Sequence, residues 1–181
     1  MALSLSRKFF SLVVQGGPLI LLYFLSISET DTQFSNIYQI LSFNFQIIII
    51  YYWMLRDPNI LGNGHIFSAG IINDLVMALP LGTSAISYLT VSFVASYIRN
   101  MTVNMTLFTD WFTFLIAIFF SNAIYLLLIT NFSNFQYEYK EVLYNAFFTF
   151  MFFPIFWVIF GNYKKLLRQN WYDKQFRLRL K

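Results

Sequence analysis

The sequence contains no cysteine and few charged residues. Without cysteine the chain forms no disulfide, no thiolate metal site and no cysteine nucleophile. Only 11% of the 181 residues are charged, against about 25% in an ordinary soluble domain. This deficit excludes a water-soluble globular protein. The single histidine, His65, has no second histidine, cysteine or glutamate beside it, so it is a poor candidate for metal binding or acid–base chemistry.

The chain is instead rich in long apolar runs. Hydrophobic residues make up 58% of the sequence and aromatic residues 22%. No run alternates polar and apolar residues as a membrane β-barrel strand does, so we expect membrane helices, whose backbones satisfy their own hydrogen bonds. We predict an all-α integral membrane protein, a bundle of six transmembrane helices, with residues 1–162 as the membrane domain. The runs lie at 9–27, 36–55, 60–80, 82–98, 107–130 and 142–162.

The cations predict the orientation of these six spans. When the N-terminus is placed in the cytoplasm, 11 of the 12 lysines and arginines fall on the cytoplasmic side, and only Lys140 falls outside. This is the asymmetry of the positive-inside rule. We therefore expect both termini to be cytoplasmic. The cytoplasmic set includes Arg7, Lys8, Arg56 and Arg99.

Asp74 is the only acid that the apolar runs place well inside a span. A charge at that depth costs about 2.5 to 3.5 kcal/mol on insertion scales, so it needs a reason to be there. Asn73 is beside it, and Asn44 and Asn122 fall at comparable depth on two other spans. A polar layer around Asp74 is therefore expected. Its role is either binding and docking, as is usual for intramembrane acids, or hydrogen bonding between helices of the same bundle.

Glycine and proline residues surround this acid. Gly70 lies on the helical face of Asp74, where its missing side chain lets another backbone approach closely. Pro80 and Gly82 break the helix after the acid. We predict that Gly70, Asn73, Asp74 and Gly82 shape a groove, filled by a partner helix or by the chain's own bundle.

Catalytic residues are not found in any recognisable arrangement. No serine, histidine and aspartate fall at a common depth, and no pair of intramembrane carboxylates exists. We expect a protein without enzymatic activity, cofactor, metal or nucleic-acid partner.

The C-terminal residues 163–181 form a basic segment that we predict to be a cytoplasmic tail. Each cation near an anionic membrane surface adds about 1 kcal/mol of binding. Attachment to anionic lipid explains this composition, and docking of a cytoplasmic protein is the alternative. The candidate surface residues are Lys164, Lys165, Arg168, Lys174, Arg177 and Arg179.

Several short motifs resemble those of the bacterial rod shape-determining protein MreD family. The second run ends in Tyr51-Tyr52-Trp53, and the last span ends in the basic Tyr163-Lys164-Lys165-Leu166. Between them the resemblance rests on Gly64, Gly70, Asp74-Leu75, Pro80-Leu81-Gly82 and the Pro154 to Trp157 pair.

This resemblance implies a multi-pass protein of the bacterial inner membrane that acts as a scaffold. Members of the family bind the bitopic protein MreC. Through it they connect with the actin-like MreB, the glycosyltransferase RodA and a class B penicillin-binding transpeptidase, so that peptidoglycan is inserted along a rod-shaped cell. The polar layer leaves one competing interpretation, a membrane-embedded substrate-binding subunit of a vitamin-type transporter.

Overall fold

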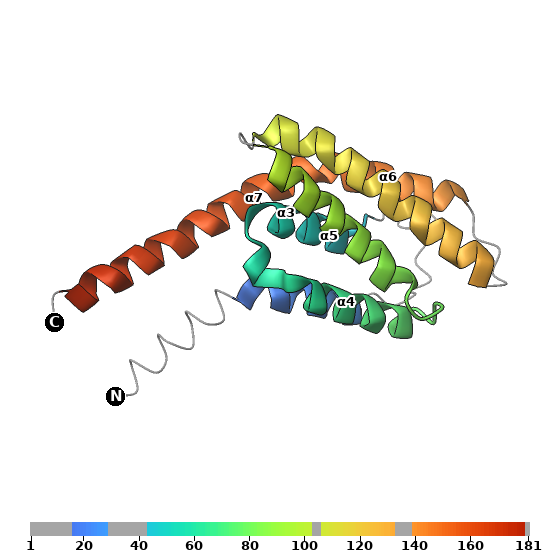
Figure 1. The fold of residues 1–181 in the computed structure, drawn as a ribbon, viewed down its shortest axis with the longest axis horizontal. Coiled ribbons are helices and arrows are strands. Elements are labelled where there is room, and N and C mark those ends of the chain that lie inside the picture. Colours follow the sequence, from blue (N-terminus) through green and yellow to red (C-terminus); the bar gives the residue numbers. More distant parts are fainter. Residues whose placement is uncertain (1–15, 29–42, 103–105, 133–138, 180–181) are drawn as a thin grey trace.

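The chain is entirely helical in the residues that the computed structural model describes, which are 16–28, 43–102, 106–132 and 139–179. Consecutive helices run in opposite directions (Figure 1). The predicted all-helical class is confirmed for this part of the chain. Its six helices are Gly16–Ser28, α3 (Phe45–Arg56), α4 (Pro58–Val76), α5 (Thr83–Met101), α6 (Leu107–Phe132) and α7 (Tyr139–Arg179).

Helix α3 lies at the centre of the bundle. Its residues from Gln46 to Leu55 are all buried, and it packs against α4, α5, α6 and α7. A helix with apolar side chains on every face is stable only where every face is covered. This explains the central position of α3. With 12 residues it is about 18 Å long, shorter than the roughly 30 Å hydrocarbon core of a bilayer.

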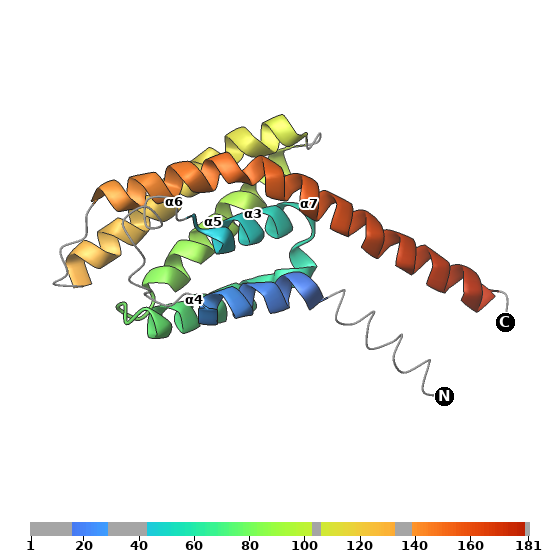
Figure 2. The same ribbon diagram turned by 180° about the vertical axis from the view of Figure 1, so that it is seen from behind.

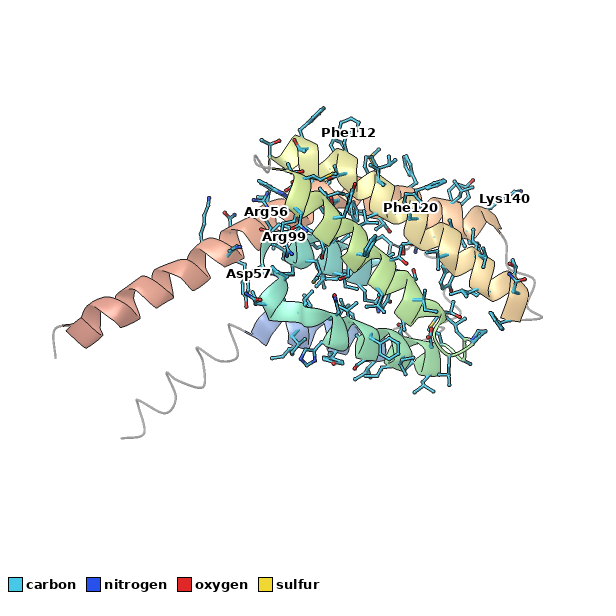
Figure 3. The ribbon with its side chains drawn as sticks, viewed as in Figure 1. Arg56, Asp57, Arg99, Phe112, Phe120 and Lys140 are labelled. Atoms are coloured by element: carbon cyan, nitrogen blue, oxygen red, sulfur yellow. The ribbon has the colours of Figure 1, made fainter. Side chains whose placement is uncertain are left out.

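Helices α6 and α7 expose most of their apolar side chains. The stretches Leu107–Phe132 and Lys140–Lys165 are long and apolar enough to cross a membrane, and only 28% and 11% of their most apolar parts are buried. Phe112 and Phe120 of α6 are 55% and 50% exposed and point away from the bundle (Figure 3). The apolar core helix of a soluble protein would be buried. This surface therefore indicates association with a membrane.

Charged side chains gather at opposite ends of the bundle. Arg56, Asp57 and Arg99 lie together at one end, and Lys140 lies at the other (Figure 3). We call these the Arg56 end and the Lys140 end. The described cations are thus separated along the bundle as the sequence predicts, whereas Arg7 and Lys8 lie outside the described residues.

Helix α7 continues past the point where the sequence places the end of the last span. It runs without interruption for 41 residues, from Tyr139 to Arg179. Beyond the Arg56 end it projects away from the other helices (Figure 2). The basic tail is therefore a direct extension of a bundle helix.

Candidate functional site

Asp74 caps the N-terminus of helix α5. It lies in the last turn of α4 and is completely buried. Its Oδ2 accepts a hydrogen bond from the backbone N–H of Gly82 at 2.8 Å, and its Oδ1 accepts one from the N–H of Ser84 at 2.8 Å. The first N–H groups of a helix have no partner within the helix. Asp74 thus does for α5 what an N-cap residue does, but from the preceding helix.

This position explains how the buried charge is tolerated. The N-terminus of a helix carries a partial positive charge, and hydrogen bonds to a carboxylate are stronger than those to a neutral acceptor. Both oxygens of Asp74 are engaged by the chain itself. The geometry therefore accords with bonding inside the bundle and gives no support to Asp74 as a docking residue.

Asn73 extends the network to a third helix. Its Oδ1 accepts a hydrogen bond from Nε2 of Gln46 at 3.2 Å, and its Nδ2 donates to Oγ of Ser84 at 3.2 Å. Helices α3, α4 and α5 are joined in this way. The sequence identifies Asn73 but not its two partners. Gln46 could have been found, because it is the amide side chain that directly precedes the continuous apolar stretch 47–55.

The predicted groove beside Gly70 is filled by helix α5. A Cβ atom added to Gly70 would lie 2.6 Å from the backbone nitrogen of Ala85, so the two backbones touch. Gly82 adopts the left-handed conformation, with φ 99°, which glycine adopts at little cost. Gly70, Asn73, Asp74 and Gly82 therefore do lie together. What fills the space between them is the chain's own helix.

The other two members of the expected polar layer lie elsewhere. Asn44 caps α3, where its side chain accepts the N–H of Ile47 at 3.1 Å. Asn122 is half-buried on α6, next to Ser121, and it is Ser121 that bonds Ser87 of α5 at 2.6 Å. No hydrogen bond in the described part of the chain joins Asn44 or Asn122 to Asp74.

A second buried acid, Asp110, forms a charged cluster at the Arg56 end. Its Oδ2 accepts hydrogen bonds from Nη2 of Arg56 at 2.5 Å and from Nε1 of Trp157 at 2.8 Å. The guanidinium of Arg56 also lies 5.4 Å from the centre of the Trp157 ring, a cation–π distance. Asp110 is only 2% exposed, although it lies in the first turn of α6 and not well inside the apolar run, where the sequence places Asp74. The sequence feature that could have pointed to Asp110 is an acid in the first turn of a long apolar run.

Two further cations of this end bind the C-terminus of α3. Nη1 of Arg99 donates to the carbonyl of Met54 at 3.0 Å. Nζ of Lys164 donates to the carbonyl of Arg56 at 2.9 Å and lies 3.7 Å from a carboxylate oxygen of Asp57. The last carbonyls of a helix lack partners in the helix and attract cations. The charges of the Arg56 end therefore hold α3 to α5, α6 and α7.

The predicted basic surface is divided by this arrangement. Lys164 is turned inward, onto α3, whereas Lys165 is exposed. Four of the predicted residues lie on the projecting part of α7, and their side chains are outside the described residues: Arg168, Lys174, Arg177 and Arg179.

The first half of helix α4 exposes four polar or small residues together with Phe67, which is 45% exposed. We call the polar and small residues the α4 face: Asn63, Gly64, His65 and Ser68. Oδ1 of Asn63 accepts a hydrogen bond from Ser92 at 2.7 Å, and Nδ1 of His65 lies 3.1 Å from the hydroxyl of Tyr23. A Cβ atom on Gly64 would meet nothing within 4 Å. Among the described residues the face is therefore open at Gly64, which leaves room for close approach.

The described side chains do not bring together a set suited to catalysis or metal binding. Within that part of the chain, no group of three or more histidine, aspartate or glutamate residues could hold a metal ion. The buried acids bond to helix ends and to an arginine, not to each other. The fold and these sites define a helical, membrane-associated bundle whose polar groups connect helices. Comparison with protein families, curated proteins and solved structures finds no match to the chain.

Proposed function

We propose that this protein is a non-enzymatic scaffold of the bacterial inner membrane that belongs to the cell-elongation machinery. It binds MreC and so helps to position peptidoglycan synthesis by RodA and a class B penicillin-binding transpeptidase, in connection with MreB. The motifs that resemble those of the MreD family support this proposal. So does the use of the polar groups in the described part of the chain, which connect one helix to another.

The proposed topology has six spans with both termini in the cytoplasm. Arg56, Arg99 and Lys164 meet at one end of the bundle, and Lys140 stands at the opposite end. The positive-inside rule assigns the end rich in cations to the cytoplasm. The projecting part of α7 then enters the cytoplasm, where its cations face anionic lipid or a soluble partner.

The α4 face is the observation that carries the scaffold proposal. Ser92, which bonds Asn63, is seven residues from Arg99 along α5, or about 10 Å. The α4 face therefore lies inside the hydrocarbon layer, where exposed polar groups are costly. Small residues and hydrogen-bonding side chains are what membrane helices use to pack against each other. We assign this face to the membrane-spanning helix of MreC.

Site-specific photo-crosslinking tests this assignment. A photoreactive phenylalanine analogue is placed at Ser68 on the α4 face, and in a control variant at Phe120, which is 50% exposed on the apolar side of α6. We expect the Ser68 position to crosslink to MreC in native membranes at least five times more than the Phe120 position. Equal yields would contradict the assignment of the face.

Purification of the tagged protein in mild detergent tests the function itself. We expect MreC and the wall-synthesis enzymes to co-purify. Recovery of an ATP-driven transporter module or of a stoichiometric vitamin would contradict the proposal and favour a transporter subunit. That alternative depends on a polar layer of Asn44, Asp74 and Asn122, and in the described part of the chain no hydrogen bond joins Asn44 or Asn122 to Asp74.

A further inference from the structure

The turn between α4 and α5 carries only apolar side chains. Residues 77–82 read Met-Ala-Leu-Pro-Leu-Gly, without a charged or hydrogen-bonding side chain. Leu75 and Leu81 are 64% and 68% exposed at this turn, and Val76 and Ile86 beside them are 38% and 43% exposed. Turns that meet water are usually built from polar residues. The composition of this turn is unsuited to water.

The backbone of the turn is largely satisfied by the chain itself. Met77 donates its N–H to the carbonyl of Asn73 at 2.9 Å, and Leu79 donates to the carbonyl of Asp74 at 2.9 Å. Gly82 donates to the side chain of Asp74 at 2.8 Å, and Pro80 has no N–H to donate. In hydrocarbon, backbone polar groups must find partners within the protein. The carboxylate of Asp74 supplies one in place of water.

The register of the helices gives the depth of the turn. Ser87 of α5 bonds Ser121 of α6. From this contact α5 continues four residues to its first residue, Thr83, whereas α6 continues eleven residues to Phe132. At 1.5 Å per residue α6 extends about 10 Å farther than α5. The turn stops short of the end of α6 in both views (Figures 1 and 2).

Helix α7 gives the same result independently. The N–H of Asn44, at the start of α3, bonds Oγ1 of Thr149, and from there α7 continues nine residues to Lys140, about 13 Å. Gln46 links this level of α3 to Asn73, three residues before the end of α4. The turn therefore lies well below Lys140 along the bundle.

We propose that the α4–α5 turn is immersed in the hydrocarbon of the outer leaflet, with Leu75, Val76, Leu81 and Ile86 in contact with lipid acyl chains. This inference rests on the membrane-spanning bundle of the proposed function. Acyl chains fit the surface better than a protein does, because its exposed side chains are mostly bulky and apolar, and residues 77–82 offer none of the hydrogen-bonding side chains that membrane helices use to bind one another. It also lies at the level of Leu127, which is 60% exposed on the apolar side of α6.

Cysteine labelling tests the depth directly, because the chain has no cysteine of its own. Three single variants are compared: Leu81→Cys at the turn, Lys140→Cys at the outer end, and Phe120→Cys in the middle of α6. Each protein is purified and placed in nanodiscs of phosphatidylethanolamine and phosphatidylglycerol, where no partner protein is present. A water-soluble maleimide reacts with thiolates, which do not form in hydrocarbon.

We expect the L81C and F120C variants to react at least ten times more slowly than K140C, and all three to react fully after denaturation in SDS. Fast labelling of L81C with slow labelling of F120C would overturn the immersed turn and leave the spanning bundle in place. Fast labelling of both would overturn the immersed turn and the membrane-spanning arrangement together. Slow labelling of L81C without any partner also excludes protection by another protein.

Discussion

The two buried acids of the bundle are stabilised in opposite ways. At the Lys140 end, Asp74 accepts hydrogen bonds from backbone N–H groups at the start of α5, and no cation takes part in them. At the Arg56 end, Asp110 is paired with Arg56 and bonded to Trp157. The first arrangement is local, spanning ten residues or fewer, whereas the second joins positions 54 and 47 residues apart.

This difference shows what each acid contributes. Asp74 completes a turn between two consecutive helices, so its loss disturbs one helix start. Asp110 joins three helices, so its loss or the loss of its partner separates parts of the chain that only the tertiary fold brings together. Substitutions at the Arg56 end should therefore lower the unfolding free energy more than substitutions around Asp74.

The largest effect is expected from Arg56→Met. It leaves the carboxylate of Asp110 buried without its counter-charge, which costs about 3 to 5 kcal/mol of unfolding free energy. Unfolding by SDS in mixed micelles measures the change. The double variant Arg56→Met with Asp110→Asn is the control, and we expect it to recover most of the loss. A double variant as unstable as the single one would show that the ion pair is not the cause.

Gly70→Ala disturbs the Asp74 end through packing. The new methyl group meets the backbone of Ala85, which cannot move aside without shifting the start of α5 away from Asp74. We expect a loss of about 2 to 3 kcal/mol, measured by the same unfolding assay. Gly64→Ala is the matched control, since its Cβ would meet nothing within 4 Å. Equal losses for the two variants would argue against close contact at Gly70.

Asp74→Asn tests the capping role itself. The amide keeps the shape of the carboxylate but turns an NH2 group toward one of the two N–H donors, so one bond is lost. We expect a loss of about 1 to 2 kcal/mol and lower accumulation in membranes. MreC recovered per folded molecule should stay constant in co-purification. A drop in MreC at unchanged stability would instead make Asp74 a docking residue.

The smallest effect is expected from Ala78→Gly, in the turn beside Asp74. Ala78 has φ 52°, a left-handed conformation that costs a residue with a Cβ about 1 to 2 kcal/mol. Glycine removes this strain but has more freedom in the unfolded chain. We expect the unfolding free energy to rise by about 0.5 kcal/mol. Ala123→Gly on the exposed, helical side of α6 should lose about 1 kcal/mol, and a loss at both positions would contradict the strain at Ala78.

Local patterns in the sequence predict one of these two sites and miss the other. The group around Asp74 is visible because all its predicted members lie within 13 residues of α4, the turn and the start of α5, where helical spacing and one short turn bring them together. Asp110 and Arg56 stand near the ends of two apolar runs, where charges commonly face water. Their pairing depends on how α3, α6 and α7 assemble, which the spacing within one run does not show.

The rest of the predicted site fails because the sequence does not fix how deep a residue lies along its span or toward which neighbour its side chain points. Counting residues along a span places Asn44 in a polar layer, but α3 begins next to it, so it serves as a cap. Asn122 misses the contact made by Ser121, its neighbour, because one residue along a helix is a rotation of about 100°. The helices themselves are predictable from the length and apolarity of the runs.

The central position of α3 sets an order for folding. Its N-terminal end is held by Thr149 of α7, 105 residues away, and its C-terminal carbonyl by Lys164, 108 residues away. During synthesis the chain is made from the N-terminus, so α3 is made before the helices α4 to α7 that enclose it. The middle of this protein is therefore completed last, and a chain that stops before α7 leaves both ends of its most buried helix without these partners.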